Sequence, residues 1–146
     1  MLKAKIKKLR DNAQIPKRGS EEAAGFDLYA ATDYDIQIQP HQTVMIGTGV
    51  AITPPKGYFG AIFARSGLAT KRCVRPANCV GVCDYDYNGE YIVACHNDSD
   101  KIVEINAGER IAQLVFLPYQ DVDFDVVDEL KPTKRGNGGF GSTGNV

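Results

Sequence analysis

The chain has 146 residues, a net charge of −1 and 24% charged side chains, which together exclude several classes of protein. Its length corresponds to one domain, with a core large enough to fold without disulfides or metal staples. The nearly neutral charge argues against a broad basic surface for stable nucleic-acid binding. No segment approaches the roughly 20 apolar residues of a membrane-spanning helix. The basic N-terminal residues lack the apolar run of a signal peptide, so we expect a cytoplasmic protein without a membrane partner.

Alternation of apolar and polar residues, the pattern of half-buried β-strands, dominates the chain. The expected strands lie at 4–9, 36–38, 43–53, 58–64, 90–95, 101–105 and 110–117, with a further alternating segment at 122–126. Asn88-Gly89, between two apolar runs, predicts a two-residue β-hairpin. Only 66–71 looks helical, with Ser66 as its N-cap. The pattern predicts an all-β sandwich or barrel with one short helix and, after about residue 131, a flexible C-terminal arm.

Four cysteines raise the alternative of a zinc site: Cys73, Cys79, Cys83 and Cys95. Cys79 and Cys83 lie four residues apart, and Cys95 is followed by His96, so ligands of a suitable kind are present. The paired C-x-x-C knuckles of many structural zinc sites are missing, however. We therefore expect small buried thiols instead of a metal centre.

Two segments carry residues suited to phosphate chemistry. Asp84 and Asp86 stand at positions i and i+2, so on a strand they would share a face and could bind Mg²⁺ or exchange protons. A polar turn would look the same. Arg65-Ser66 precedes the expected helix, whose free N–H groups suit a phosphate, although an ordinary N-cap beside a surface arginine is the simpler alternative.

Two further candidates are weaker when each is taken alone. Arg110 and Gln113 flank Ile111, which alternation places in the core, so both polar side chains would be available to a ligand. Solvated polar residues beside a turn are the simpler interpretation. Asp27, at the start of a strand, is by itself an ordinary turn aspartate. Because no G-x-S-x-G or Walker lysine pattern is present, hydrolases built on those motifs have no support.

Five separated motifs, taken in order, give these signals a common explanation. They are AAGFDLYA (23–30), ARSGLA (64–69), NCVGVCDYDYNGEY (78–91), GERIAQLVF (108–116) and RGNGGFGSTG (135–144). In this order they resemble the five motifs of the homotrimeric dUTPase family over nearly the whole chain. The resemblance implies a distorted jelly-roll-like fold of the β-clip type in residues 1–134. It also implies that the glycine-rich arm, 135–146, closes over an active site of the trimer.

The resemblance further implies an activity and an assembly. Members of that family hydrolyse dUTP to dUMP and pyrophosphate with Mg²⁺, which limits uracil incorporation into DNA and supplies dUMP for thymidylate synthesis. Their homotrimers share active sites: motifs one, two and four come from one subunit, the third from a second and the fifth from the third. Two alternative functions are considered. One is a dCTP deaminase, whose second motif is of the Arg-Ser-Ser type, whereas this chain has Gly67 after Ser66. The other is a non-catalytic binding module.

Each motif carries residues whose roles the resemblance implies. Asp84 matches the catalytic aspartate that activates the attacking water. Asp27 matches a residue that reaches the metal through water, the direct ligands being mainly substrate phosphates. The implied substrate-binding residues are Arg65, Ser66, Gly67 and Gln113 for the phosphates, Asn78, Gly81, Val82 and Tyr87 for base and sugar, and Arg135, Phe140, Gly141, Ser142 and Thr143 in the arm. Tyr87 would pack on the deoxyribose and exclude a 2′-hydroxyl, and Phe140 would stack on uracil.

Three positions depart from the family's common pattern. Val80 stands where a proline is usual, Cys83 where an isoleucine is typical, and Asn88 where arginine or glutamine is frequent. None of them removes a catalytic group. They put the packing of this segment and the affinity for substrate in question.

Overall fold

Eleven strands and one helix are present in residues 2–139, the part of the chain that the computed structural model describes. The helix, α1, is Ser66–Arg72, and the strands are β1 (Lys5–Lys8), β2 (Lys17–Arg18), β3 (Phe26–Tyr29), β4 (Ile36–Ile38), β5 (Thr43–Thr53), β6 (Tyr58–Phe63), β7 (Val74–Pro76), β8 (Gly81–Cys83), β9 (Glu90–Asn97), β10 (Val103–Ile105) and β11 (Arg110–Pro118). The all-β class is confirmed. The strands expected between residues 4 and 117 are all present, with ends displaced by two residues at most.

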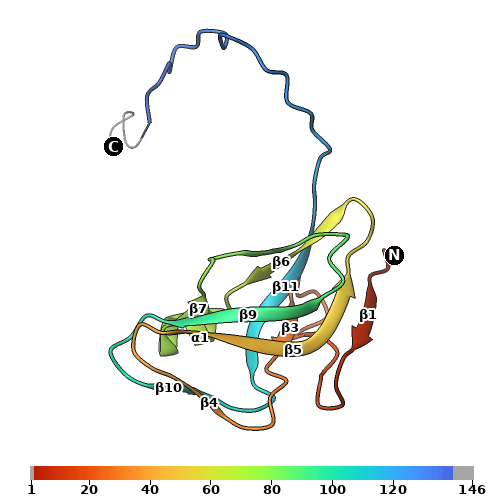
Figure 1. Cartoon of the computed structure of the whole chain (residues 1–146), viewed down its shortest axis with the longest axis vertical. Helices are drawn as coiled ribbons and strands as arrows, with labels where there is room; N and C mark the ends of the chain where they lie inside the picture. Colours follow the sequence, from red (N-terminus) through yellow and green to blue (C-terminus); the bar gives the residue numbers. More distant parts are fainter. Residues whose placement is uncertain (1, 140–146) are drawn as a thin grey trace.

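Two large antiparallel sheets pack face to face, and a small ribbon of β4 and β10 extends beside them (Figure 1). One sheet has the order β1-β5-β9-β7 and the other the order β2-β3-β11-β6-β8. Apolar residues from both sheets, such as Val93 of β9 and Leu114 of β11, belong to one core. The fold is therefore a sandwich, with its core between the two sheets.

The side chains of β9 show why the sequence adopts this arrangement. Tyr91, Val93 and Cys95 are at most 2% exposed, whereas Ile92, which lies between the first two, is 42% exposed. Burying a large apolar side chain stabilises the fold by roughly 1.5–3 kcal/mol. A slip of one residue would turn this whole set toward solvent, so burial fixes the register of the strand.

The hairpin predicted at Asn88-Gly89 is wrong. β8, which precedes this dipeptide, pairs with β6, whereas β9, which follows it, pairs with β5 and β7. Residues 84–89 therefore cross from one sheet to the other. The dipeptide marks a change of chain direction, but the burial of each strand decides which strands pair.

Helix α1 begins differently from the prediction. Its N-cap is Arg65, whose backbone is extended (φ −86°, ψ 129°) and whose side chain makes no capping hydrogen bond, so Ser66 is the first helical residue. The helix is anchored by the buried Leu68. It ends at Cys73, which adopts the left-handed conformation (φ 55°) and donates its N–H to the Leu68 carbonyl.

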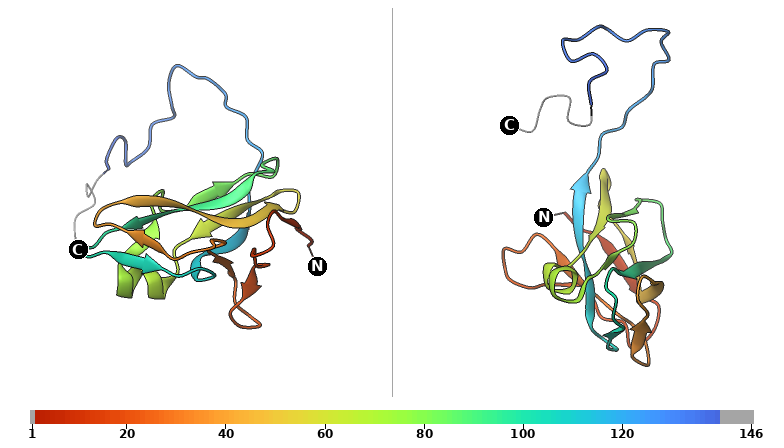
Figure 2. Two further views of the ribbon diagram at one scale, coloured as in Figure 1. Left: turned by 60° about the horizontal axis from the view of Figure 1, so that its bottom comes forward. Right: turned by 90° about the vertical axis from the view of Figure 1, so that its left-hand side faces the viewer.

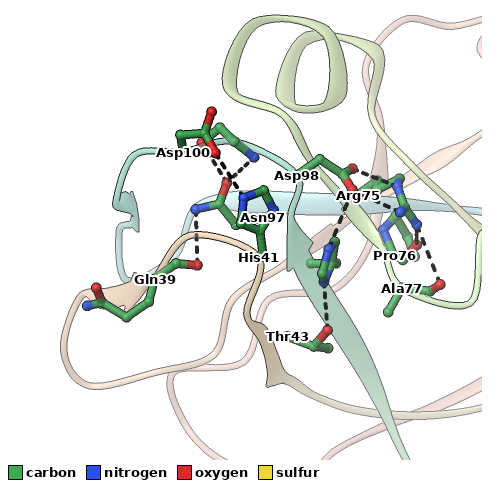
Figure 3. A network of polar contacts seen from close by, with 11 residues as sticks. Gln39, His41, Thr43, Arg75, Pro76, Ala77, Asn97, Asp98 and Asp100 are labelled. Atoms are coloured by element: carbon green, nitrogen blue, oxygen red, sulfur yellow. Dashed lines mark hydrogen bonds and ion pairs between the residues drawn. The ribbon is translucent and has the colours of Figure 1, made fainter.

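A buried asparagine organises the far end of β9 (Figure 3). The Asn97 side chain is fully buried, and its Nδ2 donates to the carbonyls of Ile38 at 3.0 Å and Lys101 at 2.7 Å. Its Oδ1 accepts the Ser99 N–H at 2.9 Å. Since every hydrogen-bonding group of this amide is used, it ties the β9–β10 loop to β4 without a desolvation penalty.

The chain leaves the two sheets after β11 and extends away from them (Figures 1 and 2). Residues 119–139 contain no strand or helix, so the strand expected at 122–126 is wrong in this single chain. Phe124 and Val126 are 93% and 94% exposed. Within residues 2–139, no helix is long and apolar enough to cross a membrane.

Two glycines with positive φ allow a test of the packing. Gly49 (φ +67°) lies inside β5, and a Cβ added to it would lie 2.6 Å from the Ala13 Cβ. A Cβ added to Gly57 (φ +80°) would meet no atom within 4 Å. Both alanine variants incur backbone strain of about 1 kcal/mol. Only Gly49→Ala must also displace the core, so we predict that it lowers the free energy of unfolding by about 2–4 kcal/mol in urea titrations. Equal losses in the two variants would contradict this account.

Candidate active site

Residues of three motifs meet where β3, β11 and the end of β6 lie side by side. Strand pairing sets Gln113 of β11 opposite Asp27 of β3 on one side and opposite Phe63 of β6 on the other. Arg65 follows β6 by two residues and begins α1. Sequence segments that are far apart are thereby brought to one place, which we call the Asp27 cluster: Asp27, Arg65, Arg110 and Gln113.

Asp27 is the centre of this cluster. Its Oδ1 accepts a hydrogen bond from Arg65 Nε at 2.8 Å, and its Oδ2 accepts one from Arg110 Nη1 at 3.2 Å. The Asp27 side chain is 13% exposed, whereas those of Arg65 and Arg110 are 27% and 50% exposed. Two guanidinium groups around one carboxylate leave an excess positive charge facing solvent. This arrangement suits a phosphate, which arginine binds through paired N–H donors.

Gln113 is held in place on both sides. Its Nε2 donates to the Ala64 carbonyl at 2.8 Å, just before Arg65. A Cβ added to Gly25 would lie 2.6 Å from the Gln113 Oε1, so any other residue there would displace this amide. One amide hydrogen of Gln113 is thus committed to the backbone and the second is left to donate to a ligand. Ser66 and Gly67 are exposed beside this cluster at the start of α1.

The second group of predicted residues lies in and after β8. Gly81 and Val82 belong to this strand, and Asp84 and Tyr87 follow it in a turn closed by a hydrogen bond from the Tyr87 N–H to the Asp84 carbonyl at 3.2 Å. Asn78 precedes the strand in the β7–β8 connection. Because β8 ends at Cys83, Asp84 and Asp86 do not share a strand face, and the alternative of a polar turn is confirmed. Both carboxylates instead line an open pocket together with Val82.

The ring of Tyr87 is fixed by its surroundings. Its hydroxyl donates to the Glu90 carbonyl at 3.0 Å, and its ring stacks on Tyr91 with the centroids 6.3 Å apart. A Cβ added to Gly89 would lie 2.4 Å from the Tyr87 hydroxyl oxygen. Any residue other than glycine at that position would therefore displace the ring.

The two groups are far apart within one chain. β6 and β8 are antiparallel, with Gly60 opposite Cys83. Arg65 follows Gly60 along one direction, and Asp84 follows Cys83 along the other. At about 3.3 Å per residue, the Cα atoms of Arg65 and Asp84 are separated by roughly 20 Å. The single chain therefore brings Asp27, Arg65 and Gln113 together but not Asp84.

The arm residues are only partly described. Arg135 Nε donates to the Gly138 carbonyl at 2.7 Å, and the arm that carries it points away from both sheets (Figure 1). The predicted sites at Phe140, Gly141, Ser142 and Thr143 lie outside the described residues. Within residues 2–139, no hydrogen bond or ion pair joins Arg135 to the Asp27 cluster or to the turn after β8.

In residues 2–139, possible metal ligands do not cluster in space as a zinc site would require. Within the described part of the chain, no three His, Cys, Asp or Glu side chains form a cluster able to hold a metal ion. The expectation of buried thiols holds for Cys83 and Cys95 and is wrong for Cys73 and Cys79, which are exposed. Burial raises the pKa of the Cys83 thiol to about 11 and that of Cys95 to about 12.

Arg110 was expected to be available to a ligand, but its contact with Asp27 was not predicted, and Glu90 was assigned no site role. Arg110 holds the second oxygen of Asp27, a contact that depends on the pairing of β3 with β11 and has no local sequence signal. Glu90 receives hydrogen bonds from Arg10, which is 80 residues away in sequence. Glu90 lies in the third motif, 78–91, but nothing in that segment indicates its contact with Arg10.

The fold and the site together define a jelly-roll-type β-sandwich in which two arginines, a glutamine and an aspartate cluster beside a short helix. The dUTPase family model matches residues 11–144. The deoxyuridine 5'-triphosphate nucleotidohydrolase of Hydrogenobaculum sp. is 45% identical over 143 residues, which are 98% of this chain and 99% of that protein. The enzyme of the same name from Desulfitobacterium hafniense is 47% identical over 146 residues, covering 98% and 97%. The chain belongs to the dUTPase family, as its motifs indicated.

Solved structures agree with this family. The dUTPase of Staphylococcus bacteriophage 80alpha, solved with dUPNHPP, superposes with a TM-score of 0.88 at 29% identity, covering 97% of this chain and 98% of that one. The dUTPase of phage phi11 of S. aureus superposes with a TM-score of 0.79 at 25% identity, covering 90% and 99%. The sandwich is thus shared by relatives with little sequence identity to this chain.

The difference in burial between the cysteines predicts a difference in reactivity. The thiolate is the reactive species, so burial protects Cys83 and Cys95 by raising their pKa and by blocking access. We predict that two thiols of the native protein react rapidly with DTNB at pH 8, and the other two only in guanidinium chloride. Replacement of both Cys73 and Cys79 by serine should abolish the rapid phase. Rapid reaction of all four thiols would contradict the burial of this pair.

Proposed function

We propose that this chain hydrolyses dUTP to dUMP and pyrophosphate, the reaction for which its relatives are named. The observation that carries the proposal is the Asp27 cluster. Three widely separated family motifs converge there and present two guanidinium groups and an amide around one carboxylate. In a cell, this activity would limit uracil incorporation into DNA and would supply dUMP for thymidylate synthesis.

The Asp27 cluster would bind the triphosphate. Arg65, Ser66 and Gln113 supply donors that stabilise the charge developing on the leaving pyrophosphate. The backbone N–H groups of Ser66 and Gly67, at the first turn of α1, add further donors. Because Asp27 already holds Arg65 in place, these donors require little reorganisation when the substrate arrives.

The site suits a Mg²⁺ ion that would contact the protein through water. Both oxygens of Asp27 accept hydrogen bonds from arginine, so the carboxylate would reach the ion through water. Phosphate oxygens of the substrate would supply most of the direct ligands, a mode of binding that Mg²⁺ favours. When bound, the ion would neutralise charge on the phosphates.

Asp84 would act as the general base. A carboxylate within hydrogen-bond reach of a water molecule accepts its proton as the water oxygen attacks the α-phosphorus, and the pyrophosphate leaves with the bonding electrons. Asp84 is exposed at the end of β8, where a substrate can approach. Asn78, Gly81 and Val82 would contact the uracil, and the fixed ring of Tyr87 would pack on the deoxyribose.

The site would be completed by other copies of the chain. A base roughly 20 Å from the phosphate donors cannot serve the same α-phosphorus within one subunit, which supports an active site shared between subunits. The family resemblance implies that the assembly is a homotrimer with three such sites. Exposed apolar side chains in the extended segment after β11 also support association: Val122, Phe124, Val126 and Leu130 are 66–94% exposed. Residues 1–134 would form the body, and residues 135–146 would close over a site of the trimer.

One assay distinguishes this proposal from its two rivals. Each deoxynucleoside triphosphate is incubated with the protein and Mg²⁺, and both pyrophosphate and ammonia are measured. We predict pyrophosphate from dUTP alone. Ammonia from dCTP would instead indicate a deaminase, and no product from any substrate would indicate a binding module.

The role of Asp84 is tested in the same assay. We predict that Asp84→Asn lowers kcat by roughly 10²–10⁴-fold, because the amide cannot accept the proton of the water. Asp100→Asn is the control, since Asp100 is 96% exposed and its one ion pair is with His41 within residues 2–139. Both variants should unfold at the same urea concentration as the wild type. Near-normal kcat in Asp84→Asn would show that another group is the base.

A further inference from the structure

The carboxylate of Glu90 joins segments that are distant in sequence. Glu90 is the first residue of β9, and its side chain is 17% exposed. Arg10 Nη2 donates to the Glu90 Oε1 at 2.7 Å and to its Oε2 at 2.6 Å. Arg10 also donates through Nη1 to the Ala31 carbonyl at 3.1 Å. The pair therefore connects β9 to the loops after β1 and β3.

The same carboxylate fills a bulge in the neighbouring strand. The pairing of β5 with β9 shifts between Gly47 and Ala51. Such a shift takes backbone groups out of the ladder. The Gly49 N–H in this bulge donates to the Glu90 Oε1 at 2.7 Å. A Cβ added to Gly47 would lie 2.4 Å from the same oxygen, so the bulge has room for this side chain only because residue 47 is glycine.

The backbone of Glu90 in turn holds Tyr87, whose hydroxyl donates to the Glu90 carbonyl at 3.0 Å. The residues 84–89 thus have two separate anchors. Asp84 follows Cys83, which is held by the pairing of β8 with β6. Tyr87 is held from the other end, through Glu90 and the stacking on Tyr91. Of these two residues, Tyr87 is the one that Glu90 contacts directly.

We propose that Glu90 is a positioning residue for sugar selection: its ion pair with Arg10 and its bond to the β5 bulge hold Tyr87 where it rejects a ribonucleotide. The inference rests on the proposed packing of Tyr87 on deoxyribose. Rejection of a 2′-hydroxyl depends on a ring that cannot move aside, because a clash discriminates only when the clashing group is fixed. A change at Glu90 would therefore lower the preference for dUTP over UTP more than it lowers the kcat for dUTP.

Three variants remove the contacts of this carboxylate in steps. Glu90→Gln keeps an oxygen for the Gly49 N–H but loses the ion pair, Arg10→Met removes the cation, and Glu90→Ala loses both contacts. We measure kcat and KM for dUTP and UTP. The ratio of kcat/KM for dUTP to that for UTP should fall about 3–10-fold in Glu90→Gln and Arg10→Met, and about 10–100-fold in Glu90→Ala. The kcat for dUTP should stay within about threefold of wild type.

A matched control lies at the other end of β9. Asp98→Asn breaks the ion pair in which Arg75 Nε and Nη2 contact Asp98 at 2.7 and 2.9 Å (Figure 3). Asp98 directly follows β9, whereas Glu90 is its first residue. This variant should leave the substrate ratio within about twofold of wild type. Tyr87→Phe, which removes the hydroxyl that Glu90 holds, should lower the ratio as much as Glu90→Gln.

The outcomes separate this inference from the function on which it rests. An unchanged ratio in folded Glu90→Gln and Glu90→Ala, together with a lowered ratio in Tyr87→Ala, would overturn the positioning role of Glu90. So would an equal loss of kcat for both substrates. An unchanged ratio in Tyr87→Ala would overturn the sugar-packing role of Tyr87, and no turnover of dUTP by the wild type would overturn the proposed activity.

Discussion

The antiparallel pairing of β6 with β8 is the constraint from which the properties of the site follow. β6 ends beside Arg65 and the Asp27 cluster, whereas β8 runs in the opposite direction and ends beside Asp84. The groups proposed to bind phosphate and the carboxylate proposed as the base are therefore carried to opposite ends of one pair of strands. The pairing is rigid, because Ile62 of β6 and Cys83 of β8 are both buried in the core. A site that needs both groups must combine surfaces of different copies.

Each half of the site is organised before any substrate binds. At one end, Asp27 holds two arginines, and the Ala64 carbonyl holds Gln113. At the other end, the Tyr87 ring is held by stacking on Tyr91 and by its bond to Glu90. Preorganised groups cost little entropy when the substrate binds, which suits catalysis by positioning and electrostatics. In the proposed homotrimer, assembly would set the placement of the two halves relative to each other.

The sequence predicted those features that depend on local pattern. Alternation identified strands such as 36–38 and 43–53 with the ends that the structure has. It failed where the outcome depends on distant residues. Asn88-Gly89 marks a turn, but the partners of β8 and β9 lie elsewhere in the chain. The alternation at 122–126 has a strand's pattern without a strand partner in residues 2–139, as expected of a segment whose apolar face is covered by another molecule.

In the candidate site, too, sequence patterns were informative, whereas contacts between distant residues were not predictable. Motif order was sufficient to identify the family, because five separated matches are specific even when each one is weak. The contacts that fix those residues were not predictable: Arg110 reaches Asp27 and Arg10 reaches Glu90 across 83 and 80 positions of sequence. Pairing of strands creates both contacts, and no local signal encodes them.

Complementation between two inactive variants is the most direct test of whether one site draws on different subunits. Asp84→Asn and Arg65→Met are unfolded together in equal amounts, refolded, and assayed for dUTP turnover. If the two groups come from different subunits of a closed trimer, random mixing gives about half times half, or about a quarter, of the sites both intact groups. The account predicts that the mixture recovers up to about a quarter of wild-type activity, far above either variant refolded alone. A mixture no more active than the separate variants, with mixed trimers verified by mass spectrometry, would contradict it.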